Sequence, residues 1–306
     1  MHSKSIEKIL AELSGDGDIY YKPNPGNGGD SLIALGAFTV FRKLGLSVKI
    51  IEDDNFDCRG KTVIYAGGGN LVGIYPNARD YILNNAEKFK RFILLPHTVK
   101  SSDDVLSVCG KNFILFARES VSYKYLKENA TAGAEICLDH DMAFHVDPRE
   151  YLENEKISLI GAIAKKLIWK TTGNDARRKV PSPSRMVKNS VLEVKGMMDG
   201  RQVGNFFRSD AEAIKQNRSL PKNNIDLSSM YEYGTSNMEL CEYAASRMLN
   251  YINKFEVINT DRLHVCIGAA LLGKNVNFYP NSYYKCKAVF DYSIKDKFSN
   301  VTWCGD

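Results

Sequence analysis

The hexapeptide Asn259-Thr260-Asp261-Arg262-Leu263-His264 joins an apolar run at residues 255–258 to a second apolar run at residues 265–272. The first run has the length and composition of a buried strand, and the second has those of a buried helix. The junction therefore predicts a strand followed directly by a helix, which is the repeating unit of α/β folds. Arg262 and His264 fall in the first turn of the predicted helix, where free backbone N–H groups favour an anion.

These two side chains indicate a phosphorylated substrate that is both bound and protonated. A guanidinium group binds phosphate or carboxylate through two parallel hydrogen bonds, and an imidazole exchanges a proton near neutral pH. Positions i and i+2 point to different sides of a helix, yet both can reach a ligand centred on its axis. The alternative is an ordinary strand–helix junction with a solvated arginine and a hydrogen-bonded histidine.

The first half of the chain repeats the strand–helix pattern. An amphipathic helix at the N-terminus places Ile6, Ile9, Leu10 and Leu13 on one face. Helices are predicted at residues 30–44, 77–90 and 120–129, and strands at residues 18–22, 47–51, 61–66, 91–95, 112–117 and 134–138. Continuously apolar strands that alternate with helices indicate a mainly parallel sheet with both faces covered.

The second half predicts a smaller α/β domain, with strands at 203–207, 255–258 and 275–279 and helices at 236–252 and 262–272. Asp147-Pro148 is the predicted boundary, which gives an N-terminal domain at 1–147 and a C-terminal domain at 148–306. The predicted fold class is thus α/β, with two Rossmann-like domains facing a cleft. Ligands of this architecture bind at the C-terminal ends of the strands.

The composition is that of a soluble globular protein, with 44% hydrophobic and 25% charged residues. The net charge of +5 is compatible with anionic substrates or membrane surfaces, and no nucleic-acid partner is expected. The seven cysteines lie at least 18 residues apart, so we expect reduced thiols, no metal site and a cytoplasmic location. Neither a signal peptide nor a run of about 20 apolar residues is present.

A basic insertion is predicted at about residues 156–200. Eight Lys/Arg and one Asp between Lys165 and Lys188 give that segment a charge of +7, and residues 157–169, which overlap it, are strongly apolar with two lysines. Residues 180–184, which contain two prolines, predict a flexible or extended loop. Basic charge beside an apolar stretch suits peripheral contact with the inner face of an anionic membrane. The alternative is a solvated loop that follows a core helix.

A glycine-rich loop, Asn24-Pro25-Gly26-Asn27-Gly28-Gly29-Asp30, joins the first predicted strand to the first long helix. It departs from a dinucleotide fingerprint, because Ser31 occupies the position of the third glycine. The Asp30 carboxylate in the first helical turn would repel a pyrophosphate and better suits sugar hydroxyls or proton abstraction. The alternative for Asp30 is a helix N-cap.

Three other segments follow predicted strands and should reach the cleft. Gly67-Gly68-Gly69-Asn70 predicts a loop whose backbone passes close to a ligand, with a tight turn as the alternative. Arg118 and His97 each follow a strand, where capping is the alternative. In the second half, Arg208 ends a strand, and Ser209 or Asp210 then caps a predicted helix. Arg208 therefore adds a second cation to the domain that contains Arg262.

These segments, in this order, resemble the polysaccharide pyruvyl transferase family. The resemblance is carried by NPGNGGD at 24–30, AGGGN at 66–70, ARES at 117–120, DMAF at 141–144, FFRSD at 206–210 and TDRLH at 260–264. It spans residues 24–282, nearly the whole chain. It implies a glycosyltransferase-B-like pair of Rossmann-type domains and transfer of pyruvate from phosphoenolpyruvate onto two hydroxyls of a sugar. The product would be a cyclic ketal on an exopolysaccharide, a capsule or another cell-envelope glycan, or on its lipid-linked oligosaccharide precursor.

The resemblance also implies roles for individual residues. Arg208, Arg262 and His264 would contact phosphoenolpyruvate, whose roughly three negative charges match two arginines and a helix N-terminus. His264 would be the general acid and Asp30 a candidate base. The acceptor would contact the loops of the N-terminal domain, namely Asn27, Gly28, Gly68, Gly69, Asn70 and Arg118. The reaction requires no cofactor and no metal.

Two alternatives use the same architecture. A glycosyltransferase with a nucleotide-sugar donor would use similar arginines to bind a diphosphate. A non-catalytic sugar-binding protein would keep the fold, but the Arg-x-His pattern at Arg262 and His264 argues against it.

Overall fold

The structure is a computed structural model that describes residues 4–15, 17–53, 55–131, 133–152, 163, 181–198, 202–214 and 220–305. The chain divides into two compact units. Unit 1 comprises Met1–Asn24, Gly36–His145 and Asp291–Ser293, and unit 2 comprises Pro25–Leu35, Val146–Phe290 and Ile294–Asp306. The glycine-rich loop and the start of the first long helix therefore group with the second half of the chain.

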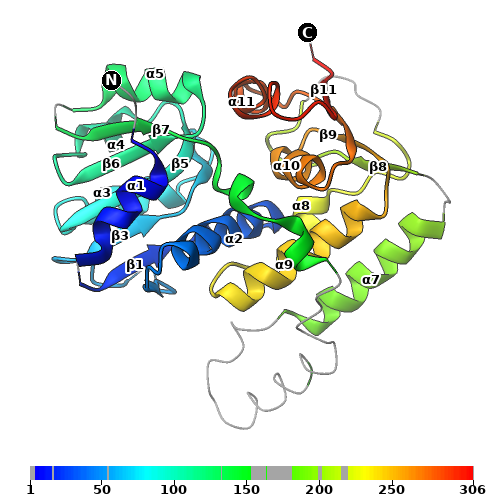
Figure 1. The fold of residues 1–306 in the computed structure, drawn as a ribbon, viewed down its shortest axis with the longest axis horizontal. Helices are drawn as coiled ribbons and strands as arrows, with labels where there is room; N and C mark the ends of the chain where they lie inside the picture. The colour runs from blue at the N-terminus through cyan, green and yellow to red at the C-terminus, as the bar shows by residue number, and fades with distance from the viewer. Residues whose placement is uncertain are drawn as a thin grey trace. The chain divides into compact units, whose positions relative to one another are not determined.

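Unit 1 is built on a seven-stranded sheet (Figure 1). Its strands are β1 (Ile19–Lys22), β2 (Val48–Ile50), β3 (Thr62–Tyr65), β4 (Gly68–Leu71), β5 (Arg91–Val99), β6 (Phe113–Ala117) and β7 (Glu135–Leu138). The order is β2-β1-β3-β5-β6-β7, with β4 paired to β5, and each of these pairings is parallel. The prediction of an α/β fold with a mainly parallel sheet is confirmed.

The helices of unit 1 are mostly those that the apolar pattern predicts. They are α1 (Ile6–Ala11), the second half of α2 (Gly28–Lys43), α3 (Asn77–Asn85), α4 (Asp103–Ser107) and α5 (Ser120–Asn129), with 3-10 turns at Glu12–Gly15 and Met142–His145. The four apolar side chains of the N-terminal helix are buried, as predicted. Helix α3 ends before residue 90, because the Asn85 side chain turns back to donate to the Tyr81 carbonyl at 2.9 Å.

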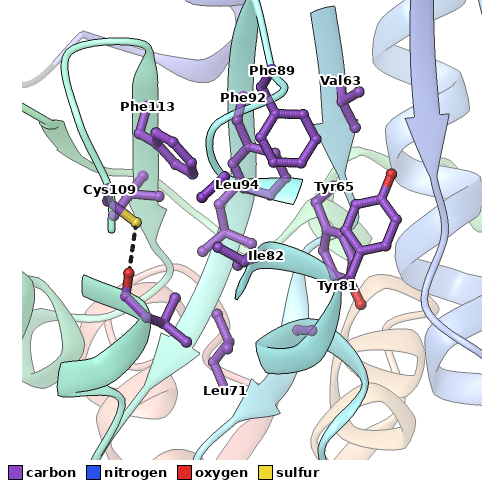
Figure 2. Close-up of a cluster of buried hydrophobic side chains, with 14 of the residues drawn as sticks. Val63, Tyr65, Leu71, Tyr81, Ile82, Phe89, Phe92, Leu94, Cys109 and Phe113 are labelled. Atoms are coloured by element: carbon purple, nitrogen blue, oxygen red, sulfur yellow. Dashed lines mark hydrogen bonds between the residues drawn. The ribbon is translucent and has the colours of Figure 1, made fainter. Parts of the chain in front are cut away.

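Aromatic side chains fill the core beneath the central strands of unit 1 (Figure 2). The ring of Phe92 on β5 packs against Phe89 at 4.7 Å and against Phe113 on β6 at 5.1 Å between centroids. Tyr65 on β3 packs against Tyr81 on α3 at 5.5 Å. These tilted ring contacts add to the stabilisation that comes from burying apolar area beneath β3, β5 and β6.

The triple-glycine segment differs from its prediction, because Gly68–Leu71 is strand β4 rather than a loop or a tight turn. Gly68 pairs with His97 and Leu71 pairs with Val99, with a register shift between them. In that interval the Asn70 N–H donates to the His97 Nε2 at 3.1 Å. A side chain thus replaces a backbone carbonyl of the ladder, and glycines have no strand propensity that would have indicated this strand.

Unit 2 is built on a four-stranded parallel sheet in the order β11-β10-β9-β8. Its strands are β8 (Val203–Phe206), β9 (Val257–Thr260), β10 (Asn275–Phe278) and β11 (Val301–Trp303). Its helices are α7 (Pro183–Met198), α8 (Leu227–Met230), α9 (Met238–Asn253), α10 (Leu263–Leu271) and α11 (Lys285–Val289), with a 3-10 turn at Pro148–Tyr151 and a π-helical turn at Phe290–Ile294. The first half of α2, up to Leu35, also belongs to this unit.

Helix α7 corrects the extended loop predicted at residues 180–184, because the helix begins at Pro183. Proline suits the first helical position, where its missing N–H has no partner to lose. Figure 1 shows α7 alongside α9, where Glu193 accepts from Arg247 and from Tyr231. The rest of the predicted basic insertion lies outside the described residues, apart from Ile163.

One face of the unit 2 sheet carries a row of asparagines. Asn277 on β10, Asn259 on β9 and Asn205 on β8 are direct neighbours in register. The Asn277 amide donates to Asn259 at 2.8 Å, Asn259 donates to Asn205 at 2.9 Å, and Asn205 donates to Asn223 at 3.1 Å. The row is half-buried, whereas the opposite face presents Phe206, Ile258 and Phe278 to the core.

All seven cysteines lie among the described residues, and each is a free thiol. Within the described ranges no helix has the length and apolar character needed to cross a membrane.

Candidate functional site

The junction between β9 and α10 adopts the predicted strand–helix form. Arg262 is the N-cap residue, one position before the helix, and His264 is the second residue of α10. The Arg262 N–H donates to Thr260 Oγ1 at 3.0 Å, and that hydroxyl donates to the Phe206 carbonyl at 2.7 Å. Asp261 accepts from the Arg208 N–H at 2.8 Å. These bonds join the ends of β8 and β9, so Arg208 and Arg262 start from adjacent positions at one sheet edge.

Carboxylates surround the Arg208 guanidinium group. Its Nε and Nη2 donate to the two oxygens of Asp210 at 2.8 and 3.1 Å, and its Nη1 donates to Glu212 at 2.8 Å. Burial alone would lower the pKa of Arg208, but these two carboxylates outweigh it and raise that pKa. The helix predicted after Arg208 is absent from residues 209–214, which form a turn instead. That turn brings both carboxylates back to the arginine.

The Arg262 guanidinium group is enclosed in the same way. Its Nε donates to Asp226 Oδ1 at 2.9 Å, its Nη2 donates to Asp226 Oδ2, and its Nη1 lies 2.7 Å from Asp210 Oδ2. The Asp226 carboxylate also accepts from the backbone N–H and the hydroxyl of Ser209, each at 3.0 Å. Asp210 therefore bridges the two arginines, while Asp226 orients Arg262 alone.

A lysine completes this charged cluster. Lys285 and Asn281 both donate to Glu212 Oε2, Asn281 at 3.3 Å. Burial alone would raise the pKa values of Asp210 and Glu212, but the cations outweigh it and hold each at about 2. Burial likewise opposes ionisation of Asp226, and Arg262 lowers its pKa. All three carboxylates are therefore ionised at neutral pH, which balances the three cations.

Asp30, the second predicted catalytic residue, lies in unit 2, as does Asn27, which was predicted to bind substrate. Asn27 caps α2 by accepting from the Gly29 N–H at 2.7 Å and the Asp30 N–H at 3.3 Å, while Asp30 Oδ2 accepts from the Asn27 N–H at 3.2 Å. This is a capping box, with Asn27 as the N-cap and Asp30 as its reciprocal partner. Asp30 thus has a structural function, and its role as a base stays a prediction.

The glycines of this loop are explained by close packing. A Cβ atom at Gly29 would lie 2.6 Å from His264 Nδ1, and one at Gly28 would lie 3.1 Å from the Tyr231 Cβ. His264, half-buried, therefore faces the first turn of α2. The structure brings Asn27, Gly28 and Asp30, predicted for the acceptor side, into the unit that also contains His264 and the two arginines.

The remaining predicted residues form a polar cluster in unit 1. Arg118 is buried, pairs with Asp141 at 2.7 Å and donates to Thr98 at 2.8 Å, so its charge is neutralised within the unit. Burial, and then the charge of Arg118, lowers the pKa of His97 to about 3. The neutral imidazole then accepts from the Asn70 N–H on β4. A substrate role for Arg118 stays a prediction.

Asn70 lies at the centre of this cluster, in the strand that also contains Gly68 and Gly69. Its Nδ2 donates to Asn24 Oδ1 at 3.1 Å, and Asn24 donates to the Gly67 carbonyl at 2.6 Å. The Asn70 Oδ1 is buried and accepts no hydrogen bond from the described part of the chain. A buried acceptor without a donor is costly, so this atom is a candidate contact for a hydroxyl group.

Sequence reasoning missed the carboxylates and the lysine around the arginines. Asp210 and Glu212 follow Arg208 at two and four positions, a local signal that was available. Asp226 and Lys285 had none, because they are separated from Arg262 and Glu212 by 36 and 73 positions. Among the described residues no group of three or more His, Cys, Asp or Glu side chains is placed to hold a metal ion.

Two known proteins are similar to this chain over most of its length. The protein of Bacillus subtilis (strain 168) named "Putative pyruvyl transferase EpsO" is 24% identical over 309 aligned positions, covering 92% of this chain and 87% of EpsO. A crystal structure of a functionally uncharacterized protein from Klebsiella pneumoniae subsp. pneumoniae NTUH-K2044 superposes with a TM-score of 0.73 at 28% identity, covering 98% of this chain and 97% of that one. The sequence pattern of the family described as polysaccharide pyruvyl transferase matches residues 27–283, from the cap of α2 to beyond both arginines and His264. The chain belongs to the polysaccharide pyruvyl transferase family.

Proposed function

We propose that this protein transfers pyruvate from phosphoenolpyruvate onto two hydroxyls of one sugar, which forms a cyclic ketal. The observation that carries the proposal is the position of His264 at the start of α10, two residues after the N-cap Arg262, which shares the Asp210 carboxylate with Arg208. A proton donor next to paired guanidinium groups suits a substrate that is a phosphate ester, a carboxylate and an enol at once. Family membership supports pyruvyl transfer over glycosyl transfer from a nucleotide sugar.

The arginines would hold the donor. Arg208 and Arg262 end adjacent strands and share one carboxylate, so a single anion can contact both guanidinium groups. Charge-assisted contacts of this kind position the carboxylate and phosphate and stabilise the charge that develops as phosphate leaves.

His264 would then start the reaction by protonating the methylene carbon of the enol, which makes the central carbon electrophilic. One sugar hydroxyl adds to that carbon and loses its proton, and the C–O bond to phosphate breaks. The second hydroxyl adds and loses its proton, which closes the ketal. Of the two protons lost by the hydroxyls, one balances the proton gained by the methylene carbon, and the other leaves with the phosphate as hydrogen phosphate. Asp30 is the proposed base, since its carboxylate lies in the first turn of α2, the turn that His264 faces.

In unit 1 the acceptor would contact Gly68, Gly69 and Asn70. The buried Asn70 Oδ1 supports this assignment, because a sugar hydroxyl would supply the donor that it lacks in the described chain. We propose a lipid-linked oligosaccharide or the finished glycan as acceptor, made for an exopolysaccharide, a capsule or another envelope polymer. On this view the two units are Rossmann-like domains of a glycosyltransferase-B-like enzyme that works in the cytoplasm, peripheral to the membrane.

Mass spectrometry tests the reaction directly. Candidate lipid-linked oligosaccharides are incubated with the protein and phosphoenolpyruvate, and we expect products that gain one pyruvate and lose one water, with release of phosphate. A parallel thermal-shift series compares phosphoenolpyruvate with nucleotide sugars. Stabilisation by a nucleotide sugar alone, together with glycosyl rather than pyruvyl products, would overturn the proposal.

A further inference from the structure

Both guanidinium groups of the proposed donor site are already bound to carboxylates. In Arg208 the Nε, Nη1 and Nη2 atoms each contact Asp210 or Glu212, and in Arg262 the same three atoms each contact Asp226 or Asp210. Arg208, Arg262 and Lys285 supply three positive charges, and Asp210, Glu212 and Asp226 supply three negative ones. An anionic donor would therefore meet a neutral cluster unless one carboxylate withdraws.

The three carboxylates are not equally held. The Glu212 and Asp226 side chains are only 4% and 10% exposed, and each has donors besides the arginines. Glu212 accepts from Lys285 and Asn281, and Asp226 accepts from the Ser209 backbone and hydroxyl. Removing either one from its partners would break these hydrogen bonds to buried donors as well as its ion pairs, which is costly.

Asp210 differs from both. Its side chain is 33% exposed, and it lies in the turn after β8 rather than in a helix or strand. Besides the arginines, the Glu212 N–H donates to Asp210 at 3.1 Å. Its carboxylate can therefore move into water at lower cost than the other two.

We propose that Asp210 is a displaceable counter-ion that occupies the place of an anionic group of the donor. This rests on the proposed function. When phosphoenolpyruvate binds, one of its anionic groups replaces the Asp210 carboxylate between the two guanidinium groups. Asp226 and Glu212 stay in place and keep the guanidinium groups oriented.

The contacts of Asp210 define what would replace it. Arg208 Nε, Arg208 Nη2, Arg262 Nη1 and the Glu212 N–H converge on its two oxygens at 2.7 to 3.1 Å. Four donors in that arrangement suit a carboxylate or two oxygens of a phosphate. The exchange also favours anionic ligands over neutral ones, because only a negative charge replaces the charge that Asp210 provides beside the two guanidinium groups.

The proposal is tested by whether removing the charge of Asp210 tightens or weakens the binding of an anionic ligand. Isothermal titration calorimetry measures the binding of phosphoenolpyruvate and of inorganic phosphate to the full-length protein, Asp210→Asn and Asp226→Asn. Because Asp210→Asn removes a competing anion, its Kd for each ligand should fall about tenfold, which corresponds to about 1.4 kcal/mol. Asp226→Asn is the matched control, and there binding should weaken because Arg262 loses its orienting partner. Asp210→Glu keeps the charge and should bind like the unsubstituted protein.

Each result bears on one of the two proposals. Suppose that Asp210→Asn binds the anions more weakly than the unsubstituted protein does, and that the unsubstituted protein makes the pyruvylated product. The counter-ion role is then wrong and the transferase function stands. If Asp210→Asn binds phosphate more tightly but no form of the protein makes product, the counter-ion role stands and the function is wrong. If no form binds either anion, both are wrong.

A measurement on the unsubstituted protein tests the proposal even if Asp210→Asn fails to fold. The backbone N–H of Glu212, which donates to Asp210, gives one amide signal in nuclear magnetic resonance spectra. Adding phosphate should shift that signal as the ligand replaces the carboxylate. A signal that stays unchanged at a phosphate concentration that saturates the site would overturn the proposal.

Discussion

His264 lies half-buried against the loop of residues 25–30, at the start of α10. We expect His264→Gln to lose turnover by about 10²–10⁴-fold while phosphoenolpyruvate affinity changes little, because glutamine keeps a donor but supplies no proton. Phosphate release at saturating donor gives the turnover, and calorimetry gives the affinity. Near-normal turnover would make His264 structural, and another acid would have to be sought.

His97 gives a prediction about pH and stability in unit 1. Its pKa in the folded chain is about 3, below the ordinary value of 6.5, so the unfolded chain binds a proton that the folded chain refuses. The free energy of unfolding should therefore fall as pH drops from 6.5 toward 3, by at most about 1.4 kcal/mol per pH unit from this residue. Urea unfolding between pH 4.5 and 7 should show a shallower slope for His97→Gln, whose side chain can still accept from Asn70. Equal slopes would show that His97 is protonated in the folded protein.

The sequence predicted the residues that follow strand ends and missed their partners. Arg208, Arg262 and His264 stand at boundaries that local hydrophobic pattern defines, so they could be singled out. Their surroundings depend on Asp226 and Lys285, which come from distant segments. The pairing of Arg118 with Asp141, 23 positions later, is equally nonlocal, so its burial could not be predicted from a strand-end position.

At the scale of elements, Gly29 determines how α2 approaches α10. A methyl group there would lie 2.6 Å from His264 Nδ1 and 2.9 Å from Asn27 Oδ1. We expect Gly29→Ala to displace His264 and lower turnover at least tenfold, although alanine in a helix usually stabilises by about 0.4–1 kcal/mol. Gly15→Ala is the control, because a Cβ there has no neighbour within 4 Å. Turnover by Gly29→Ala equal to that of the control would mean that the contact has no functional role.

Long apolar strands and capped helices were predicted to within a few residues, whereas short elements were not. Helix α5 was predicted at its observed bounds, since Glu119 caps it and its apolar residues repeat regularly. Strand β11 has three residues and exists because it pairs with β10, a contact that no local pattern encodes. Strand β4 was hidden by its glycines, and its pairing depends on the His97 side chain.

At the scale of the whole molecule, sequence order did not predict which residues pack together. Residues 25–35 follow the first strand but group with unit 2, and residues 291–293 group with unit 1. His140 in the first half contacts Ser293 at 2.9 Å and packs against the Tyr292 ring at 5.0 Å. The unit to which such segments belong depends on contacts between side chains that are more than 100 positions apart in the sequence. A single boundary at Asp147-Pro148 does not describe this grouping.

The basic insertion gives a prediction for the full chain. We expect the triple variant Arg177→Ser, Arg178→Ser and Lys179→Ser to bind anionic vesicles about a hundredfold more weakly, as measured by co-sedimentation. Each of the three charges contributes about 1 kcal/mol near such a surface. Arg185 is left unchanged, because its guanidinium group donates to Glu232. The melting temperature and activity on a soluble acceptor should not change, while activity on a lipid-linked acceptor should fall.

A second triple variant controls for net charge, with serine at Lys124, Lys127 and Lys295, which are exposed. It should sediment with vesicles like the unsubstituted protein. Equal losses of vesicle binding in both triple variants would indicate a general effect of net charge. If the unsubstituted protein does not bind vesicles at low salt, the segment is a solvated insertion.

The asparagine row on the sheet of unit 2 has a consequence for how its amides can move. Asn259 accepts from Asn277 and donates to Asn205, so rotating its amide by half a turn would set oxygen against oxygen and NH₂ against NH₂. The same holds for Asn205, which donates onward to Asn223. A single amide therefore cannot reverse alone, and the four behave as one dipolar string with two orientations that interconvert only together.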